Sequence, residues 1–247
     1  MTYEALAVSV HERVCTIALK RPDALNAITP TMLRELESAL DEAAGDAQIG
    51  VIVLTGTGRA FSAGVDLKAL GGRSLRGGKV GDLLDLPARA AIEAITTAPQ
   101  PVIAKVNGAC FTGALEIALA CDLMVVAEEA KMGDTHAKWG LRPTWGMSAR
   151  LAAAVGSVRA RELSLTARTF TGAEAHAMGM AIACPPLSGL DQAVADLCAQ
   201  ILQNSADSLA AYKRLYDTPA VRQGLAREAS SDFPIADTEE RLASFRR

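Results

Sequence analysis

The chain has 247 residues, of which 25 are Lys or Arg and 28 are Asp or Glu, so its formal net charge is −3. Half of the residues are hydrophobic and 4% are aromatic, which predicts a large core built mainly from Ala, Val, Leu and Ile. The near-neutral charge excludes a strongly basic nucleic-acid-binding protein, and we expect no nucleic-acid partner.

The sequence also indicates whether to expect a metal site, a membrane span or a secretion signal. The five cysteines form no C-x-x-C pair, and with three histidines in the chain we expect no metal site. No charge-free apolar stretch reaches about 18 residues, so we expect no membrane span. The first residues lack the basic and then apolar pattern of a signal peptide, so we expect a soluble, cytoplasmic protein.

Short apolar segments alternate with helix-like segments along most of the chain. Five segments have strand patterns: residues 4–10, 14–19, 51–54, 102–106 and 123–127. Thr29 followed by Pro30 is typical of a helix start, and Gly45 ends the apolar periodicity of that helix. Alternation of strand and helix predicts an α/β chain with mostly parallel strands.

The pattern changes after Pro185 and Pro186. Residues 190–202 and 208–216 have helical periodicity with no strand pattern between them. We therefore expect an α/β body over residues 1–185 and a helical C-terminal region over residues 186–247.

The segment 55–67 follows a predicted strand and leads into a helix-like stretch, the usual place of a phosphate-binding loop. It matches neither G-x-G-x-x-G nor the P-loop pattern. Its Ala-Phe-Ser-Ala-Gly differs from the nucleophile elbow G-x-S-x-G at the first glycine. One alternative is a hydrolase that uses Ser62, Asp122 and either His136 or His176. The other is a Ser62 that only turns the chain.

Glu116 lies in a helix-like segment that is otherwise apolar on every side. Such a helix is buried, and a buried carboxylate has a raised pKa that suits proton transfer near neutrality. The alternative is a structural glutamate that pairs with a lysine or caps nearby amides. Gly113 begins this helix, where a free amide and the helix dipole can face a developing oxyanion.

Residues 131–146 contain both tryptophans and one of the three histidines. His136 is either a proton-transfer group or a hydrogen-bonded structural residue. Trp139 and Trp145 are either core residues or the border of a ligand pocket.

Taken together, these segments resemble the enoyl-CoA hydratase/isomerase (crotonase) superfamily. The resemblance rests on residues 21–27, 60–67, 101–122, 170–175 and 178–180, with Lys213 in a C-terminal helix. It covers nearly the whole chain and makes Ser62 a turn residue. It implies a spiral of repeated β-β-α units, with the C-terminal helices forming a homotrimer or a dimer of trimers.

The resemblance also implies a substrate and a set of site residues. The substrate is an acyl-CoA thioester, and no separate cofactor is expected because coenzyme A is part of the substrate. The backbone amides of Val65 and Gly113 take the positions of the oxyanion hole. Residues expected to bind coenzyme A or the acyl group are Ala24, Ala63, Asp66, Leu67, Lys68, Trp139, Pro143 and Lys213.

Hydratases that this chain resembles use two glutamates, one to activate water and one to protonate the α carbon. Glu116 occupies the first position, and His136 stands at the second, which is a departure from the family pattern. We therefore expect hydration of a trans-2-enoyl-CoA with Glu116 and His136 as the acid-base pair. The alternatives are a double-bond isomerase with the same site, and an acyl-CoA-binding protein with little turnover.

Overall fold

The computed structural model describes residues 2–67, 75–231, 233 and 235–245. The strands are β1 (Leu6–His11), β2 (Val14–Leu19), β3 (Val51–Gly56), β4 (Ala60–Ser62), β5 (Val102–Val106), β6 (Ala109–Phe111), β7 (Leu123–Val126), β8 (Lys131–Gly133) and β9 (Phe170–Thr171). The helices are α1 (Pro30–Gly45), α2 (Asp82–Thr97), α3 (Gly113–Ala120), α4 (Met147–Val155), α5 (Ser157–Thr166), α6 (Gly172–Ala177), α7 (Leu190–Leu202), α8 (Ala206–Tyr216), α9 (Pro219–Ser230) and α10 (Thr238–Phe245).

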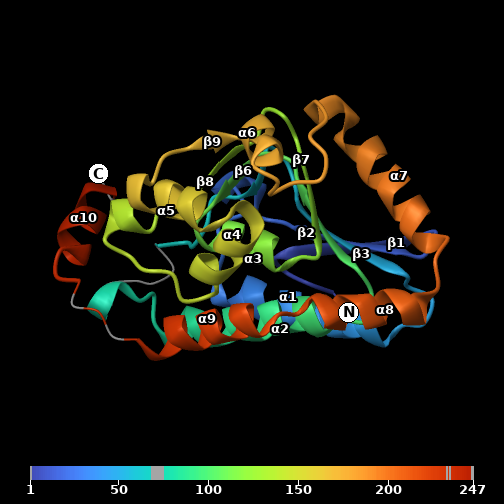
Figure 1. Cartoon of the computed structure of the whole chain (residues 1–247), viewed down its shortest axis with the longest axis horizontal. Helices are drawn as coiled ribbons and strands as arrows, with labels where there is room; N and C mark the ends of the chain where they lie inside the picture. The colour runs from blue at the N-terminus through green and yellow to red at the C-terminus, as the bar shows by residue number, and fades with distance from the viewer. Residues whose placement is uncertain (1, 68–74, 232, 234, 246–247) are drawn as a thin grey trace.

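Four successive β-β-α units, from β1-β2-α1 to β7-β8-α4, form the body of the molecule (Figure 1). One sheet has the order β1-β2-β3-β5-β7 and the other β4-β6-β8-β9. Each of the last three units therefore gives one strand to each sheet. Pairing is parallel except between β1 and β2 and between β8 and β9. The predicted α/β spiral of β-β-α units is confirmed.

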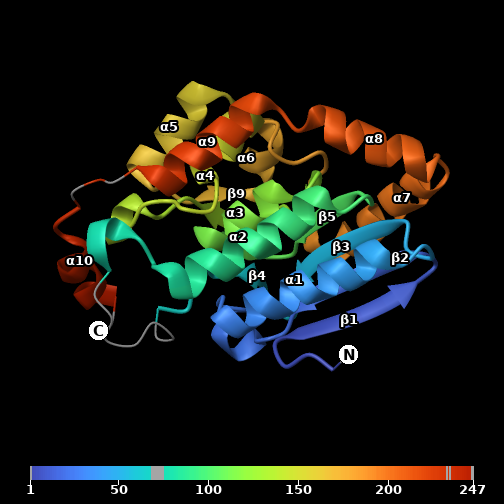
Figure 2. The ribbon, with the colours of Figure 1, turned by 90° about the horizontal axis from the view of Figure 1, so that it is seen from below.

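Helix α1 shows how the sequence forms the layer that covers the first sheet. Its N-terminus is capped by Thr29, whose Oγ1 accepts a hydrogen bond from the amide of Met32 at 3.2 Å, and Pro30 takes the first helical position. Leu33 and Leu36 are buried, and burial of each such side chain contributes about 1.5–3 kcal/mol. Helix α1 lies beside α2 across the strands (Figure 2).

The second sheet positions the candidate site. Strands β4, β6 and β8 are parallel neighbours, so their carboxyl ends meet at one edge of the sheet. The residues directly after these strands include Val65, Gly113 and His136. Three segments from distant parts of the sequence are therefore brought together at this edge.

The segment after β4 differs from the sequence prediction. Residues 60–62 form a short strand, and residues 63–67 are irregular rather than the beginning of a helix. The chain is diverted because residues 63–66 pair with the segment around Ile28: the amide of Ile28 donates to the Gly64 carbonyl, and that of Asp66 donates to the Ile28 carbonyl.

The C-terminal region consists of α7, α8, α9 and α10. The predicted helices at 190–202 and 208–216 are confirmed as α7 and α8, and two further helices follow. Helix α9 packs on α4, and α10 packs beside the 3-10 turn Ala137–Trp139. Helices α7 and α10 lie at opposite ends of the molecule (Figures 1 and 2). Within the described ranges, no helix is both long and apolar enough to cross a membrane.

Candidate active site

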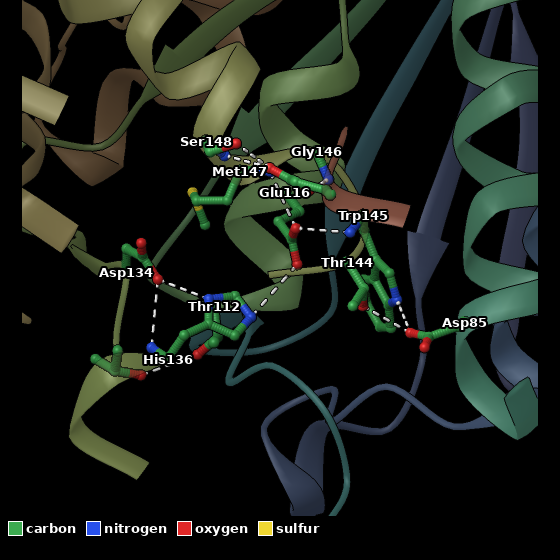
Figure 3. Close-up of polar contacts among 12 residues, drawn as sticks. Asp85, Thr112, Glu116, Asp134, His136, Thr144, Trp145, Gly146, Met147 and Ser148 are labelled. Carbon is green, nitrogen blue, oxygen red and sulfur yellow. Dashed lines mark hydrogen bonds and ion pairs between the residues drawn. The ribbon is translucent and has the colours of Figure 1, made fainter. Parts of the chain in front are cut away.

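The carboxylate of Glu116 is at the centre of the candidate site (Figure 3). It projects from the first turn of α3 and is buried, with 1% of the residue exposed. Its Oε1 accepts hydrogen bonds from the backbone amides of Trp145 at 3.0 Å and Met147 at 3.1 Å. Its Oε2 lies 3.6 Å from Nε2 of His136. Glu116 therefore has one oxygen fixed by backbone amides and the other directed at an imidazole.

Burial determines the charge state of this carboxylate. Loss of hydration raises the pKa of Glu116 from 4.5 to about 7, although His136 and the amide of Met147 oppose the shift. The negative charges of Glu228 and Asp134 push the pKa further upward. A carboxylate that titrates near neutrality can accept and release protons under physiological conditions.

His136 is held on its other side by a second carboxylate. Its Nδ1 lies 2.7 Å from Oδ1 of Asp134, and the hydroxyl of Ser164 donates to Oδ2 of the same aspartate at 2.7 Å. Burial by itself lowers the pKa of His136, but the hydrogen bond to Asp134 and the charge of Glu116 outweigh it and raise the pKa. A chain of contacts thus runs from the half-buried Ser164 through the buried Asp134 and His136 to Glu116.

Two backbone amides at the same edge are free to bind an oxyanion. The Gly64 carbonyl and the Asp66 amide both bond to Ile28, so the Val65 N–H between them points to the opposite side. Gly113 is the first residue of α3, where an N–H has no partner in the helix. Within the described part of the chain, neither of these N–H groups has an acceptor.

Close packing holds these two amide-bearing segments together. A Cβ on Gly64 would come within 2.8 Å of the Phe111 carbonyl oxygen, and one on Gly113 within 2.4 Å of the Trp145 ring. Thr112, which precedes Gly113, has φ +53° and ψ −116°, a conformation that L-residues rarely adopt. The close approach of Gly64 to Phe111 therefore brings the Val65 segment beside the turn that precedes Gly113.

A cavity of about 280 Å³ adjoins these groups. His136 lines it, whereas the Glu116 carboxylate is buried more deeply. The residues that line the cavity are Ala63, Val65, Leu67, Val80, Phe111, Thr112, Thr135, His136, Lys138, Trp139, Leu141 and Thr169. The structure thus brings His136 and Val65 together with Ala63, Leu67 and Trp139, all expected at the site from the sequence.

Other expected binding residues lie elsewhere. Lys213 forms an ion pair with Asp122 at 2.8 Å and donates to the carbonyls of Ile95 at 2.8 Å and Gln100 at 3.1 Å, so its three N–H groups have acceptors within the chain. It borders a different cavity, between α3 and the C-terminal helices. Lys68 lies outside the described residues.

The remaining expected binding residues are near the edge of the site. Ala24 ends a 3-10 turn whose neighbour, Leu25, accepts a hydrogen bond from the Ala63 amide. Asp66 forms an ion pair with Arg21 at 3.0 Å. Pro143 is half-buried in the segment between Trp139 and α4 and is not among the residues that line the 280 Å³ cavity.

The residues of the hydrolase alternative all have other partners, and His136 contacts Glu116 and Asp134 instead of Ser62 or Asp122. The hydroxyl of Ser62 accepts a hydrogen bond from the Gly64 amide at 3.1 Å, as expected of a turn residue. Asp122 pairs with Lys213, and Nδ1 of His176 donates to the Ala181 carbonyl at 2.8 Å.

Trp145 does not border the cavity, contrary to one of the two alternatives. It is buried against Gly113, and its indole N–H donates to Asp85 at 2.8 Å. Thr144 donates to the same oxygen of Asp85 at 2.7 Å. The tryptophan is a core residue that fixes the backbone whose amides bind Glu116.

Three acidic or hydroxyl side chains near Glu116 and His136 were not predicted from the sequence. Asp134 stands two residues before His136, and an Asp-x-His pair in a loop is a signal that could have been noticed. Ser164 in α5 and Glu228 in α9 carry no local signal, because their roles depend on packing between distant segments.

Comparison with known proteins agrees with the fold. The sequence model of the enoyl-CoA hydratase/isomerase family matches residues 9–235. A probable enoyl-CoA hydratase of Rhizobium meliloti (strain 1021) is 39% identical over 180 residues, which cover 73% of this chain and 68% of that protein. A probable enoyl-CoA hydratase of Mycobacterium tuberculosis (strain CDC 1551 / Oshkosh) is 34% identical over 252 residues, which cover 99% and 96%.

The solved structures agree as well. The crystal structure of an enoyl-CoA hydratase/isomerase from Xanthobacter autotrophicus Py2 is 29% identical and superposes with a TM-score of 0.88, covering 99% of this chain and 93% of that one. The chain therefore belongs to the enoyl-CoA hydratase/isomerase (crotonase) superfamily.

Proposed function

We propose that this protein is an acyl-CoA-acting lyase that hydrates trans-2-enoyl-CoA thioesters. The observation that carries the proposal is the buried pair of Glu116 and His136, whose Oε2 and Nε2 lie 3.6 Å apart. This pair lies at the sheet edge that also bears the free amides of Val65 and Gly113. Hydration of a conjugated thioester needs both a proton-transfer pair and donors for an enolate oxygen.

The proposed reaction begins with water near the pair. Glu116 accepts a proton from the water, whose oxygen bonds to the β carbon of the substrate. The π electrons of the Cα–Cβ bond move toward the thioester carbonyl and form an enolate, which the two amides stabilise. His136 then donates its proton to the α carbon, and the enolate collapses to the 3-hydroxyacyl thioester.

The pair also explains how the catalyst is restored. After one turnover Glu116 holds the proton taken from water and His136 has lost its own, so the total number of protons is unchanged. Oε2 and Nε2 are 3.6 Å apart, which is beyond hydrogen-bond distance, so that proton returns through one water or directly after a small movement of the side chains. Similar proton affinities favour this return, and the raised pKa of Glu116, about 7, brings it close to that of an imidazole.

The thioester would enter along the 280 Å³ cavity. We assign the contacts with coenzyme A and the acyl group to the expected binding residues Ala24, Ala63, Asp66, Leu67, Lys68, Trp139 and Pro143. Lys213, also expected from the sequence, is left out of this assignment because its N–H groups have acceptors within the chain and it borders a different cavity. Support for this assignment is strongest for Ala63, Leu67 and Trp139, which line the cavity together with His136.

Double-bond isomerisation is the second candidate. It is favoured by the histidine at the second acid-base position, because a glutamate and an imidazole 3.6 Å apart can pass one proton between two carbons of the acyl chain. The same pair would then remove a proton from one carbon and return it to another, with no water added.

Absorbance of the conjugated thioester separates these activities. With a short trans-2-enoyl-CoA, hydration removes the conjugated band, and the product gains the mass of one water. With the matching 3-enoyl-CoA, an isomerase instead makes the band appear. Loss of the band with the first substrate supports the proposal. If the band appears with the second substrate and stays with the first, the enzyme is an isomerase. If both substrates bind unchanged, the protein is an acyl-CoA-binding protein.

We further propose that the chain assembles as a trimer or a dimer of trimers through its C-terminal helices. Helix α8 presents Tyr212, Leu215 and Tyr216, which are exposed apolar side chains on a chain with few aromatics. Light scattering would give three or six times the chain mass. A monomer at micromolar concentration would contradict this assembly.

A further inference from the structure

We propose that Asp134 is a positioning residue that fixes the tautomer and the charge of His136, and that Ser164 holds Asp134 in place for this purpose. The inference deepens the proposed function and rests on it, because His136 is the proton donor in the proposed reaction. It gives a role to Asp134 and Ser164, neither of which belongs to the segments that carry the Val65 and Gly113 amides.

The hydrogen bonds of Asp134 define which nitrogen of His136 carries a proton. Oδ1 is 2.7 Å from Nδ1 of His136 and also accepts the His136 backbone amide at 3.3 Å, while Oδ2 accepts the Ser164 hydroxyl at 2.7 Å. Burial raises the pKa of Asp134, but the hydrogen bonds from His136 and Ser164 outweigh it and lower the pKa. An ionised carboxylate only accepts hydrogen bonds, so Nδ1 must be the donor.

This arrangement leaves Nε2 as the reacting nitrogen. The ring is anchored at Nδ1, and Nε2 points toward Oε2 of Glu116 (Figure 3). Asp134 and His136 lie in the segment after β8, whereas Ser164 comes from α5. A hydroxyl from a separate helix therefore fixes the carboxylate, which prevents rotation of the ring away from Glu116.

Three carboxylates act on the charge of His136. Asp134, Glu116 of α3 and Glu228 of α9 all favour the imidazolium. Among the described residues, Arg150 of α4 is a cation that interacts with the two glutamates, and Lys138 lines the same cavity as His136. Glu116 loses its negative charge when it accepts the proton from water, so its influence on His136 changes during the proposed reaction. Asp134 keeps its charge throughout. It therefore stabilises the imidazolium that protonates the α carbon at every stage of the reaction.

Loss of this partner has a specific consequence. An imidazole without a carboxylate behind it can place its proton on either nitrogen and loses its charge at a lower pH. In a serine protease, replacing the aspartate behind the histidine by asparagine lowers the rate about 10⁴-fold with the geometry intact. We expect Asp134→Asn to lower kcat about 10²-fold to 10⁴-fold with little change in KM.

Nuclear magnetic resonance of the histidines tests the inference without substrate. The chain has three histidines, so His136→Gln assigns the His136 signals directly. In the native protein we expect Nδ1 to stay protonated at all pH values and the pKa of His136 to lie above its usual value. Asp134→Asn should lower this pKa, and Ser164→Ala should lower it less. Asp191→Asn, which removes the exposed partner of Lys105, should leave it unchanged.

The rates of the same variants complete the test. A fall in kcat that follows the fall in the pKa of His136, with a matching shift of the pH profile, supports the positioning role. An unchanged pKa in Asp134→Asn, or a kcat that stays within twofold while the pKa falls, overturns it. Ser164→Ala keeps the test decisive if Asp134→Asn fails to fold. An inactive native enzyme with the expected histidine titration would contradict the proposed reaction but support the control of His136 by Asp134.

Discussion

Glu116 and Glu228 divide four consecutive backbone amides at the start of α4 between them. Glu116 accepts the amides of Trp145 and Met147, and Glu228 accepts those of Gly146 at 2.8 Å and Ser148 at 2.7 Å. The N-terminus of a helix attracts negative charge, which helps to hold two carboxylates at one turn. Because Glu228 lies in α9, the C-terminal region is part of the scaffold of the site in its own chain.

Glu228→Gln should shift the pH dependence of the reaction toward lower pH. Glu228 raises the pKa of both Glu116 and His136, so removing its charge lowers both. The active form has ionised Glu116 and protonated His136. Activity should therefore persist to a lower pH on the acid side and be lost at a lower pH on the alkaline side. A profile of kcat/KM against pH measures both limbs.

Glu228→Gln should also lower the free energy of unfolding. Glutamine cannot accept as many hydrogen bonds as the carboxylate, so one donor at Gly146 or Ser148 loses its partner at a cost of about 1–3 kcal/mol. Thermal unfolding measures the loss. Glu240→Gln, on the exposed face of α10, is the control. If both limbs of the kcat/KM pH profile moved to higher pH in Glu228→Gln, Glu228 would not act on the site through its negative charge.

Gly113→Ala should disturb the proposed oxyanion site. The new Cβ would meet the Trp145 ring at 2.4 Å, and Trp145 is buried and bonded to Asp85, so the Gly113 backbone must move. Displacing one oxyanion donor costs about 10²-fold to 10³-fold in kcat, and overpacking costs about 1–3 kcal/mol of stability. Gly45→Ala is the matched control, because nothing lies within 4 Å of its Cβ. Equal rates for the two variants would exclude the Gly113 amide from catalysis.

Ser62→Ala should remain an active enzyme. The Ser62 hydroxyl accepts the Gly64 amide in a buried turn, so its loss leaves that donor unpaired and costs about 1–3 kcal/mol. The rate should stay within about tenfold of the native rate, because Ser62 takes no part in the proposed proton transfers. Loss of a general acid-base residue would instead lower the rate about 10²-fold to 10⁴-fold. Steady-state kinetics and thermal unfolding check both values. A complete loss of turnover in a folded variant would restore Ser62 as a candidate nucleophile.

The parts of the fold that could be predicted are those with local signals. The wholly apolar run at 51–54 became a strand buried on both faces, and Thr29 with Pro30 marked the start of α1 correctly. Glu116 was recognised because an acid in an otherwise apolar helix requires partners, and it has them. Periodicity and capping act within a few residues, so the sequence displays them directly.

The parts that could not be predicted depend on contacts between distant segments. Glu228 reaches the amide of Gly146, 82 residues away in the chain, and Ser164 reaches Asp134, 30 residues away. Residues 63–66 follow Ile28 instead of beginning a helix because of tertiary pairing. No local pattern in the sequence records these pairings.

The most direct test of Glu116 as the acid-base residue is the hydration of a short trans-2-enoyl-CoA by the native protein and by Glu116→Gln, with binding of the CoA ester measured in parallel. Gln keeps the shape of the side chain but cannot accept a proton from water. We expect both proteins to bind the ester and the native protein alone to remove the conjugated band, with a rate at least 10²-fold above the variant. A variant that hydrates at the native rate would contradict the central role of Glu116 and make it a structural carboxylate of the α4 N-terminus.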